Sequence, residues 1–166
     1  MTAAGVVSSP ALAKVAGIQE RERLLSIYNA HTGESLKLVY WAPGDGYLNQ
    51  SLKEISWVLR DRRTDEVELI DPALLDQLYA LRLQLNSRET FHILSGYRSP
   101  RTNEMLRRNG HGVAKNSFHM QGRAVDIRLP GRDVSQVRRA ALSLQAGGVG
   151  SYRSFVHIDT GPVRSW

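Results

Sequence analysis

Two short segments of this chain alternate between apolar and polar residues, and each carries a potential metal ligand on its polar side. Asp126 stands between a valine and an isoleucine in the run AVDIRL, and His157 stands between the same two residue types in FVHIDTG. Because successive side chains of a strand point to opposite faces, the alternation predicts two β-strands with one apolar face. The chain is therefore expected to build a sheet that is buried on one side and carries a rigid polar site on the other.

A third potential ligand, His119, precedes the first of these strands in the segment SFHMQGRAVD. Gly122 predicts a turn between His119 and Asp126, so that a loop carries the histidine and the next strand carries the aspartate. Two imidazoles and one carboxylate are a common ligand set for catalytic zinc, with the fourth position left to water. We therefore expect the two strands to meet and His119, Asp126 and His157 to hold one zinc ion. The spacing alone also fits a hydrogen-bonded carboxylate at a strand end and a hydrogen-bonded core histidine.

The rest of the chain contains further segments with the periodicity of strands and helices. Alternating patterns on both sides of the HTG segment at residues 31–33 predict a β-hairpin, and residues 42–47 are predicted to form a loop. Asn49 is expected to cap one helix, and Asp71, followed by a proline, is expected to cap the next. The predicted strands are 21–30, 34–41, 91–94, 123–129, 149–152 and 155–159, and the predicted helices are 49–62, 72–85, 102–108 and 134–144. Together they indicate an α+β fold, a mostly antiparallel sheet with helices packed on one side.

Length suits a single domain with a substantial core, which we assign to residues 21–166. Residues 1–20 are small and apolar without periodicity, and they are interpreted as a flexible lead. The segment PALA before Lys14 is typical of the small-residue end of a secretory signal, so the lead is compatible with the remnant of an export signal. No segment has the pattern of a transmembrane helix.

The chain is basic, with a formal net charge of +6 and a pI near 10.0. This balance favours an anionic partner, which could be nucleic acid, a membrane surface or an acidic cell-wall polymer. Basic residues form no long run and do not interleave with aromatic residues on one strand, which argues against nucleic acid. The absence of cysteine excludes a disulfide scaffold and thiolate ligands.

Four ordered blocks of sequence resemble one group of zinc peptidases. The blocks are SGYRSPRTNEMLR at 95–107, GVAKNSFHMQGRAVDI at 112–127, GGVGSY at 147–152 and FVHIDTGPVRSW at 155–166. They resemble the YcbK/MepK branch of murein endopeptidases, within the larger group of lysostaphin-type enzymes, D-alanyl-D-alanine carboxypeptidases and Sonic hedgehog. The resemblance spans residues 21–166 and implies the fold of that group with one zinc ion held by His119, Asp126 and His157. It also implies an exported, periplasmic enzyme that hydrolyses peptide crosslinks of peptidoglycan, especially those between two meso-diaminopimelate residues. The sequence does not determine the oligomeric state, and we expect a monomer.

Arg98 follows the strand FHIL in the segment SGYRS. The resemblance implies that it binds substrate, since similar carboxypeptidases have a substrate-binding arginine at the corresponding place. A guanidinium there could bind a carboxylate or stabilise the oxyanion formed during hydrolysis, although an arginine that ties the turn to a helix remains an alternative. Ser117 and Tyr97 are further candidates for substrate contacts. Ser117 could instead order its loop, and Tyr97 could instead pack.

The general base of such a hydrolase is not supplied in either familiar way. Related carboxypeptidases have an acidic residue three positions before the second histidine, where this chain has Ser154. Other relatives have a histidine two positions before it, where this chain has Phe155. Asp159 shares a strand face with His157 and is the candidate for the base, and it could equally orient the imidazole of His157.

Four interpretations therefore remain open at this level. The leading hypothesis is a zinc murein endopeptidase. A carboxypeptidase that trims D-amino acids from stem peptides is the second, and the missing acid at position 154 argues against it. The third is a zinc-containing wall-binding module without activity. The fourth is an ordinary basic domain without metal, which one tightly bound zinc per chain would exclude.

Overall fold

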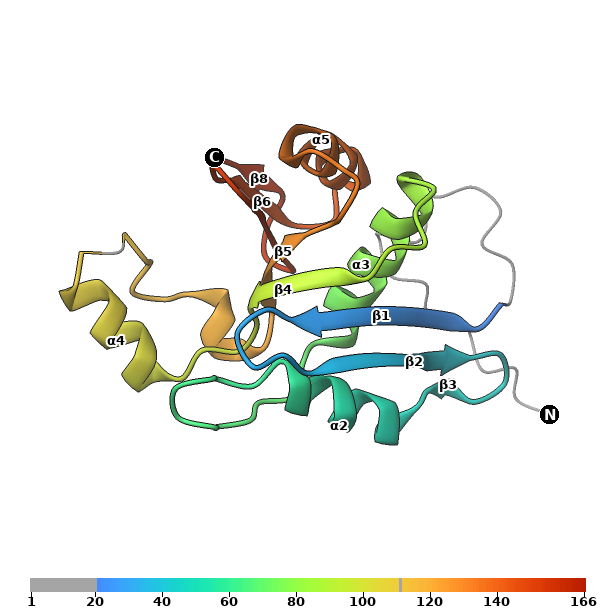
Figure 1. Ribbon diagram of the computed structural model, residues 1–166, viewed down its shortest axis with the longest axis horizontal. Coiled ribbons are helices and arrows are strands. Elements are labelled where there is room, and N and C mark those ends of the chain that lie inside the picture. Colours follow the sequence, from blue (N-terminus) through green and yellow to red (C-terminus); the bar gives the residue numbers. More distant parts are fainter. Residues whose placement is uncertain (1–20, 111) are drawn as a thin grey trace.

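The computed structural model describes residues 21–110 and 112–166, so the predicted lead at residues 1–20 lies outside the described residues. Within that part, four α-helices and eight strands are present (Figure 1). The strands are β1 Arg23–Asn29, β2 Ser35–Ala42, β3 Gly46–Tyr47, β4 Phe91–Ser95, β5 Ala124–Arg128, β6 Gly148–Ser151, β7 Val156–Asp159 and β8 Arg164–Ser165. The helices are α2 Asn49–Val58, α3 Pro72–Gln84, α4 Pro100–Arg108 and α5 Val134–Leu144, with a short 3-10 helix η1 at Phe118–Gln121.

All eight strands belong to one mixed sheet in the order β3-β2-β1-β4-β5-β7-β6-β8. The pairs β1–β4 and β6–β8 are parallel, and the other pairs are antiparallel. The predicted α+β class, the hairpin of β1 and β2 and the final antiparallel pair of β6 and β7 are therefore confirmed. The two strands predicted to carry ligands, β5 and β7, are direct neighbours near the centre of the sheet.

One continuous core lies between the sheet and the helices α2, α3 and α5. Alternate residues of β1 point into it, and the leucines of α3 fill its centre with almost no exposed surface. The apolar residues of β5 and β7, Val125, Ile127, Val156 and Ile158, belong to the same core. Because side chains alternate along a strand, Asp126 and His157 lie on the opposite face of the sheet. The core thus holds β5 and β7 in place, while the side chains of the candidate site lie on the other face of the sheet.

Helix α4 is an exception to the prediction that the helices pack on one side. It extends away from the end of the sheet (Figure 1), and only Thr102 and Asn103 of its residues are buried. Its sequence explains this position, because the segment from Pro100 to Arg108 is largely polar and offers no apolar face for the core. None of the helices in the described part of the chain has the length and apolar character needed to cross a bilayer.

Local predictions were wrong around helix α2. Its N-cap is Leu48 and not Asn49, since the backbone of Leu48 still bonds to Tyr40 and the helix begins directly after this sheet contact. The predicted loop at residues 42–47 contains the short strand β3. The helix ends at Val58 and not near Arg62, because the side chain of Asn29 donates a hydrogen bond to the Val58 carbonyl and Asp61 starts a turn. At α3, by contrast, the Asp71 carboxylate accepts from the Ala73 N–H, which confirms the predicted cap.

Candidate metal centre

Pairing of β5 with β7 brings two of the predicted ligands together. Asp126 lies directly opposite His157 in the antiparallel register. His119 reaches the same point from η1, which is a 3-10 helix and not the predicted loop. Ser117 caps η1 by accepting from the His119 N–H, and Gly122 ends it with a positive φ of 64°. A side chain at Gly122 would also collide with the Leu69 carbonyl, so glycine is required there on two grounds.

Three ligand atoms face one another at this place, and His119, Asp126 and His157 are all buried. His119 Nε2 lies 3.4 Å from Asp126 Oδ1 and 3.3 Å from His157 Nδ1. His157 Nδ1 lies 2.9 Å from Asp126 Oδ1. A tetrahedral zinc site with bonds of about 2.0–2.1 Å separates its ligand atoms by roughly 3.4 Å. The three atoms are thus already spaced nearly as zinc would require.

The hydrogen bonds on the far sides of the two rings determine what these atoms present. His119 Nδ1 lies 2.7 Å from the Gly96 carbonyl oxygen, which can only accept, so Nδ1 carries the proton. His157 Nε2 lies 2.9 Å from Asp159 Oδ2, and it donates to that carboxylate. In their neutral forms both imidazoles therefore direct a lone pair toward the Asp126 carboxylate. Such an arrangement of acceptors needs a cation or an additional proton at its centre.

Asp159 is fully buried and is surrounded by donors. Beyond His157 Nε2, Arg164 donates to both of its oxygens, and the backbone N–H groups of Gly148 and Gly161 donate to Oδ1. It lies on the far side of the His157 ring from Asp126. This geometry favours the orienting role over the role of general base, because the carboxylate is already saturated with donors.

Neighbouring charges and hydrogen bonds shift the pKa values of Asp126, Asp159 and His157. Burial by itself raises the pKa of Asp126, but the imidazoles of His119 and His157 outweigh burial and hold it well below its ordinary value. For Asp159, burial again raises the pKa, and hydrogen bonds from His157 and Arg164 lower it further than burial raises it. Burial lowers the pKa of His157, whereas Asp126 and Asp159 raise it, with a net increase. Both carboxylates are therefore ionised at neutral pH.

Arg98 lies beside the centre in a buried position. Its guanidinium donates to Asn103 Oδ1 and to Ser95 Oγ, both at 3.3 Å, and its backbone N–H donates to the His119 carbonyl. Burial lowers the pKa of Arg98, and the charge of Asp126 opposes that effect. The two long side-chain bonds leave N–H groups of the guanidinium available to a ligand.

A cleft of about 330 Å³ opens over the cluster of His119, Asp126 and His157. Ser117 lines it together with the three predicted ligands, Arg98 and Asp159. Tyr97 does not line this cleft. It packs in the core and lines the neighbouring cavity instead.

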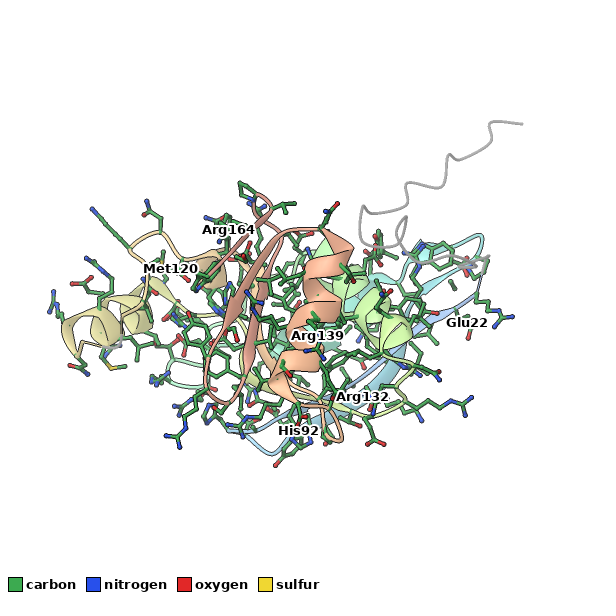
Figure 2. The ribbon with its side chains drawn as sticks, turned by 90° about the horizontal axis from the view of Figure 1, so that it is seen from above. Glu22, His92, Met120, Arg132, Arg139 and Arg164 are labelled. Carbon is green, nitrogen blue, oxygen red and sulfur yellow. The ribbon has the colours of Figure 1, made fainter. Side chains whose placement is uncertain are left out.

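The C-terminal side of the cleft contains two residues, Trp166 and Arg164, that the sequence did not predict to lie near the site. The indole of Trp166 lies against the His157 ring with 5.3 Å between centroids, and the indole N–H donates to the Tyr152 hydroxyl. A side chain at Gly150 would collide with that indole, which explains the glycine opposite His157. Arg164, labelled in Figure 2, lies on β8, a strand that was not predicted. The only available signal was the resemblance of the block FVHIDTGPVRSW, since a two-residue strand has no periodicity.

Comparison with known proteins gives a consistent result over nearly the whole chain. The family model described as peptidoglycan L,D-endopeptidase MepK matches residues 18–166. Peptidoglycan L,D-endopeptidase MepK of Escherichia coli K12 is 44% identical over 165 residues, which cover 98% of this chain and 89% of that protein. The probable peptidoglycan L,D-endopeptidase MepK of Haemophilus influenzae is 40% identical over 149 residues, covering 88% of this chain and 80% of that protein.

Proposed function

Because the chain belongs to the MepK family of peptidoglycan L,D-endopeptidases, we propose that it is a zinc-dependent hydrolase of peptide crosslinks in peptidoglycan. The crosslinks we assign to it are those between two meso-diaminopimelate residues. One observation supports this function above all others: three buried ligand atoms present lone pairs to a common centre at the bottom of an open cleft. Without a bound cation such a site would not stabilise the fold, because buried acceptors that face one another repel.

We assign one zinc ion per chain to His119 Nε2, Asp126 Oδ1 and His157 Nδ1. Zinc bound there supplies an activated water and a Lewis acid for the peptide carbonyl. Asp159 orients the His157 ring by holding its Nε2 proton, and Gly96 orients the His119 ring in the same way. Asp159 is thus proposed as a positioning residue in preference to a general base.

Arg98 is proposed to stabilise negative charge on the substrate. Its guanidinium lies in the wall of the cleft beside Asp126, and its side chain is fixed by Asn103 and Ser95. A fixed cation of this type stabilises an oxyanion without reorganisation during the reaction. Ser117 is proposed to contact substrate with its hydroxyl proton, because its oxygen accepts from the His119 N–H and its side chain lines the cleft. For Tyr97 the packed position favours support of the neighbouring cavity over direct binding.

The setting follows from the substrate. Since peptidoglycan lies outside the cytoplasm, the chain is proposed to act in the periplasm after export. We propose a monomer in which residues 21–166 form the peptidase domain, with the fold of the lysostaphin and hedgehog group, and residues 1–20 form a lead. Nucleic acid is not proposed as a partner.

The first test measures metal content by mass spectrometry in the wild type, in His157→Ala and in His92→Ala. His92 lies on β4 outside the centre and contacts Tyr28 edge-to-face, so it controls for the loss of an imidazole. About one zinc per chain is expected in the wild type and the control, and none in His157→Ala. The same samples are then used to digest crosslinked muropeptides. Loss of the metal in His157→Ala should lower the rate of cleavage by at least about 10³-fold.

Other outcomes would redirect the assignment. Zinc bound without any cleavage would favour a wall-binding module, and removal of terminal D-amino acids alone would favour a carboxypeptidase. Absence of metal from the wild type, even after zinc is added back, would refute the proposed centre.

A further inference from the structure

A second cavity, of about 370 Å³, adjoins the metal cleft on the side of β4. The two cavities share Arg98, Asp126 and Phe155 among their lining residues. They are therefore two halves of one groove that passes the metal centre. A peptide whose scissile bond lies at the centre would extend into both halves.

The lining of this second cavity is strongly basic. Besides Arg98, it includes Arg60, Arg62 and Arg63. Arg60 is already neutralised, since it forms salt bridges with Glu34 and Asp65 and packs over Trp57. Arg62 and Arg63 form no salt bridge with any carboxylate in the described part of the chain, and both are exposed at the rim.

A built turn holds these two arginines in place. Asp61 is buried, and its carboxylate accepts from the backbone N–H of Arg63 at 2.9 Å and of Ser99 at 2.8 Å. Its carbonyl accepts from Thr64 and Asp65, which closes the turn. Ser99 is the N-cap of α4 and directly follows Arg98. Asp61 thereby ties the backbone of the Arg62–Arg63 pair to that of Arg98.

The carboxylate of Asp61 forms no salt bridge with Arg62 or Arg63, and its charge offsets the positive charge of the cluster only in part. Burial by itself raises the pKa of Asp61, but hydrogen bonds from Thr102, Arg63 and Ser99 outweigh burial and lower it. The remaining positive charges repel one another. Burial lowers the pKa of Arg62, and the neighbouring charge of Arg63 lowers it further. The nearby His31 experiences the same positive electrostatic field. Burial lowers the pKa of His31 most, and the charge of Arg62 lowers it further.

We propose that Arg62 and Arg63, with Arg98, form a subsite that binds a carboxylate of the substrate peptide next to the scissile bond. This inference rests on the proposed function and assigns the substrate chemistry of one half of the groove. A diaminopimelate residue carries an α-carboxyl group at each end, so a crosslink between two of them retains a free carboxylate beside the bond that is cut. Guanidinium groups bind carboxylates through paired, charge-assisted hydrogen bonds, and binding relieves the repulsion within the cluster.

The test compares the double variant Arg62→Gln/Arg63→Gln with Arg138→Gln/Arg139→Gln. The control removes the same charge from an adjacent arginine pair on α5 (Figure 2), which packs on the opposite face of the sheet from the metal centre. Two crosslinked muropeptides are used, one with free diaminopimelate carboxylates and one with those groups converted to carboxamides. The product peptides that carry the carboxylate or the carboxamide are also titrated into each zinc-loaded protein by calorimetry, which reports binding independently of cleavage.

For the Arg62/Arg63 variant, KM for the acidic substrate and Kd for the acidic product should rise roughly 10- to 100-fold, with kcat changed much less. On the carboxamide peptides this variant should match the wild type. The Arg138/Arg139 control should match the wild type throughout, and all proteins should bind the same amount of zinc.

Two results would overturn the subsite while leaving the proposed function intact. One is cleavage and binding by the Arg62/Arg63 variant that equal those of the wild type. The other is an equal loss in both arginine pairs, which would show general charge attraction. If the wild type fails to cleave but acidic product binding still depends on Arg62 and Arg63, the proposed function falls and the subsite stands.

Discussion

Two buried carboxylates in this molecule have opposite surroundings. Asp76 on α3 is fully buried and accepts hydrogen bonds from Arg23, Tyr40 and Tyr47 at 2.7–2.9 Å. Asp126 on β5 is almost as buried, but its neighbours are ring nitrogens of His119 and His157 that act as acceptors in the neutral imidazoles. The first carboxylate has its donors within the chain, whereas the second faces further acceptors.

The two clusters differ in their numbers of hydrogen-bond donors and acceptors, and this difference separates a structural cluster from the proposed metal site. The Asp76 cluster is complete, because a carboxylate, a guanidinium and two hydroxyl groups satisfy one another. The Asp126 cluster is complete only with a cation or a proton. Burial is similar in the two places, so burial alone would not distinguish them.

The largest effect on stability is expected from Asp76→Ala. The substitution leaves the Arg23 guanidinium buried without its partner, and Arg23 Nε already lacks a hydrogen bond. Removal of one partner of a buried pair costs about 3–5 kcal/mol. Urea denaturation should show this loss, while zinc content stays at the wild-type value. Asp45→Ala, at an exposed carboxylate, is the control and should leave both quantities unchanged.

Removal of zinc should have the next largest effect on stability. If the metal binds only the folded state, free zinc at 100 times its Kd stabilises the fold by about 2.7 kcal/mol. A chelator should therefore lower the stability of the wild type and of Asp76→Ala by the same amount, since the two clusters share no residue. A melting temperature that does not respond to chelator or to added zinc would contradict the assignment of the Asp126 cluster.

The sequence predicted the Asp126 cluster better than the Asp76 cluster for a physical reason. Ligands on short strands can be predicted because the alternation of apolar and polar residues shows which side chains share a face of the sheet. The turn at Gly122 then places His119 near these ligands. Asp76 occupies a helix in which every residue from Leu74 to Leu81 is buried, so no periodic pattern distinguishes its face. Its three donors come from β1, β2 and β3, and only the tertiary fold brings them together.

In the fold as well, features with a local sequence pattern were predicted and features that depend on distant contacts were not. Strands and helices with strong periodicity were predicted within a few residues, including the final antiparallel pair. The errors involve contacts between distant residues. Strand β8 exists because it pairs with β6, and α2 ends early because Asn29 reaches the Val58 carbonyl. The support that Arg164 gives to Asp159 was missed for the same reason.

Asp159→Asn should weaken zinc binding without removing a ligand. The amide retains the shape of the side chain but loses the charge that fixes the Nε2–H tautomer of His157. Loss of such a partner typically lowers metal affinity by 10- to 100-fold, or about 1.4–2.8 kcal/mol. Competition against a chelator measures the change. Unaltered zinc affinity combined with loss of cleavage would instead identify Asp159 as the general base.

Zinc affinity should also fall as the pH is lowered, by about tenfold per pH unit for each proton that the metal displaces. The pKa of His157 is raised above 6.5 in the folded state without metal, so a proton competes with zinc already near neutral pH. In the zinc-free protein the same shift has the opposite sign. The protonated ring stabilises the fold fully below pH 6.5, and this contribution is lost as the pH rises through the raised pKa. Calorimetric zinc titrations in buffers of different ionisation enthalpy measure the protons released, and a zinc affinity that does not change with pH would contradict the assignment.

The smallest loss of stability is expected from a substitution that removes only one hydrogen bond from the Asp76 cluster. Tyr47→Phe removes one hydroxyl donor from Asp76 and leaves Arg23 and Tyr40 bound to it. Because Tyr47 is only partly buried, water can replace the lost donor, and a loss of about 1 kcal/mol in unfolding free energy is expected. Tyr40→Phe should cost more, since Tyr40 is fully buried and water cannot reach the vacated position. Urea denaturation of the two variants orders the effects, and zinc content should be unchanged in both. A loss of zinc in either would mean that the two carboxylates are coupled and that the donor count does not separate them.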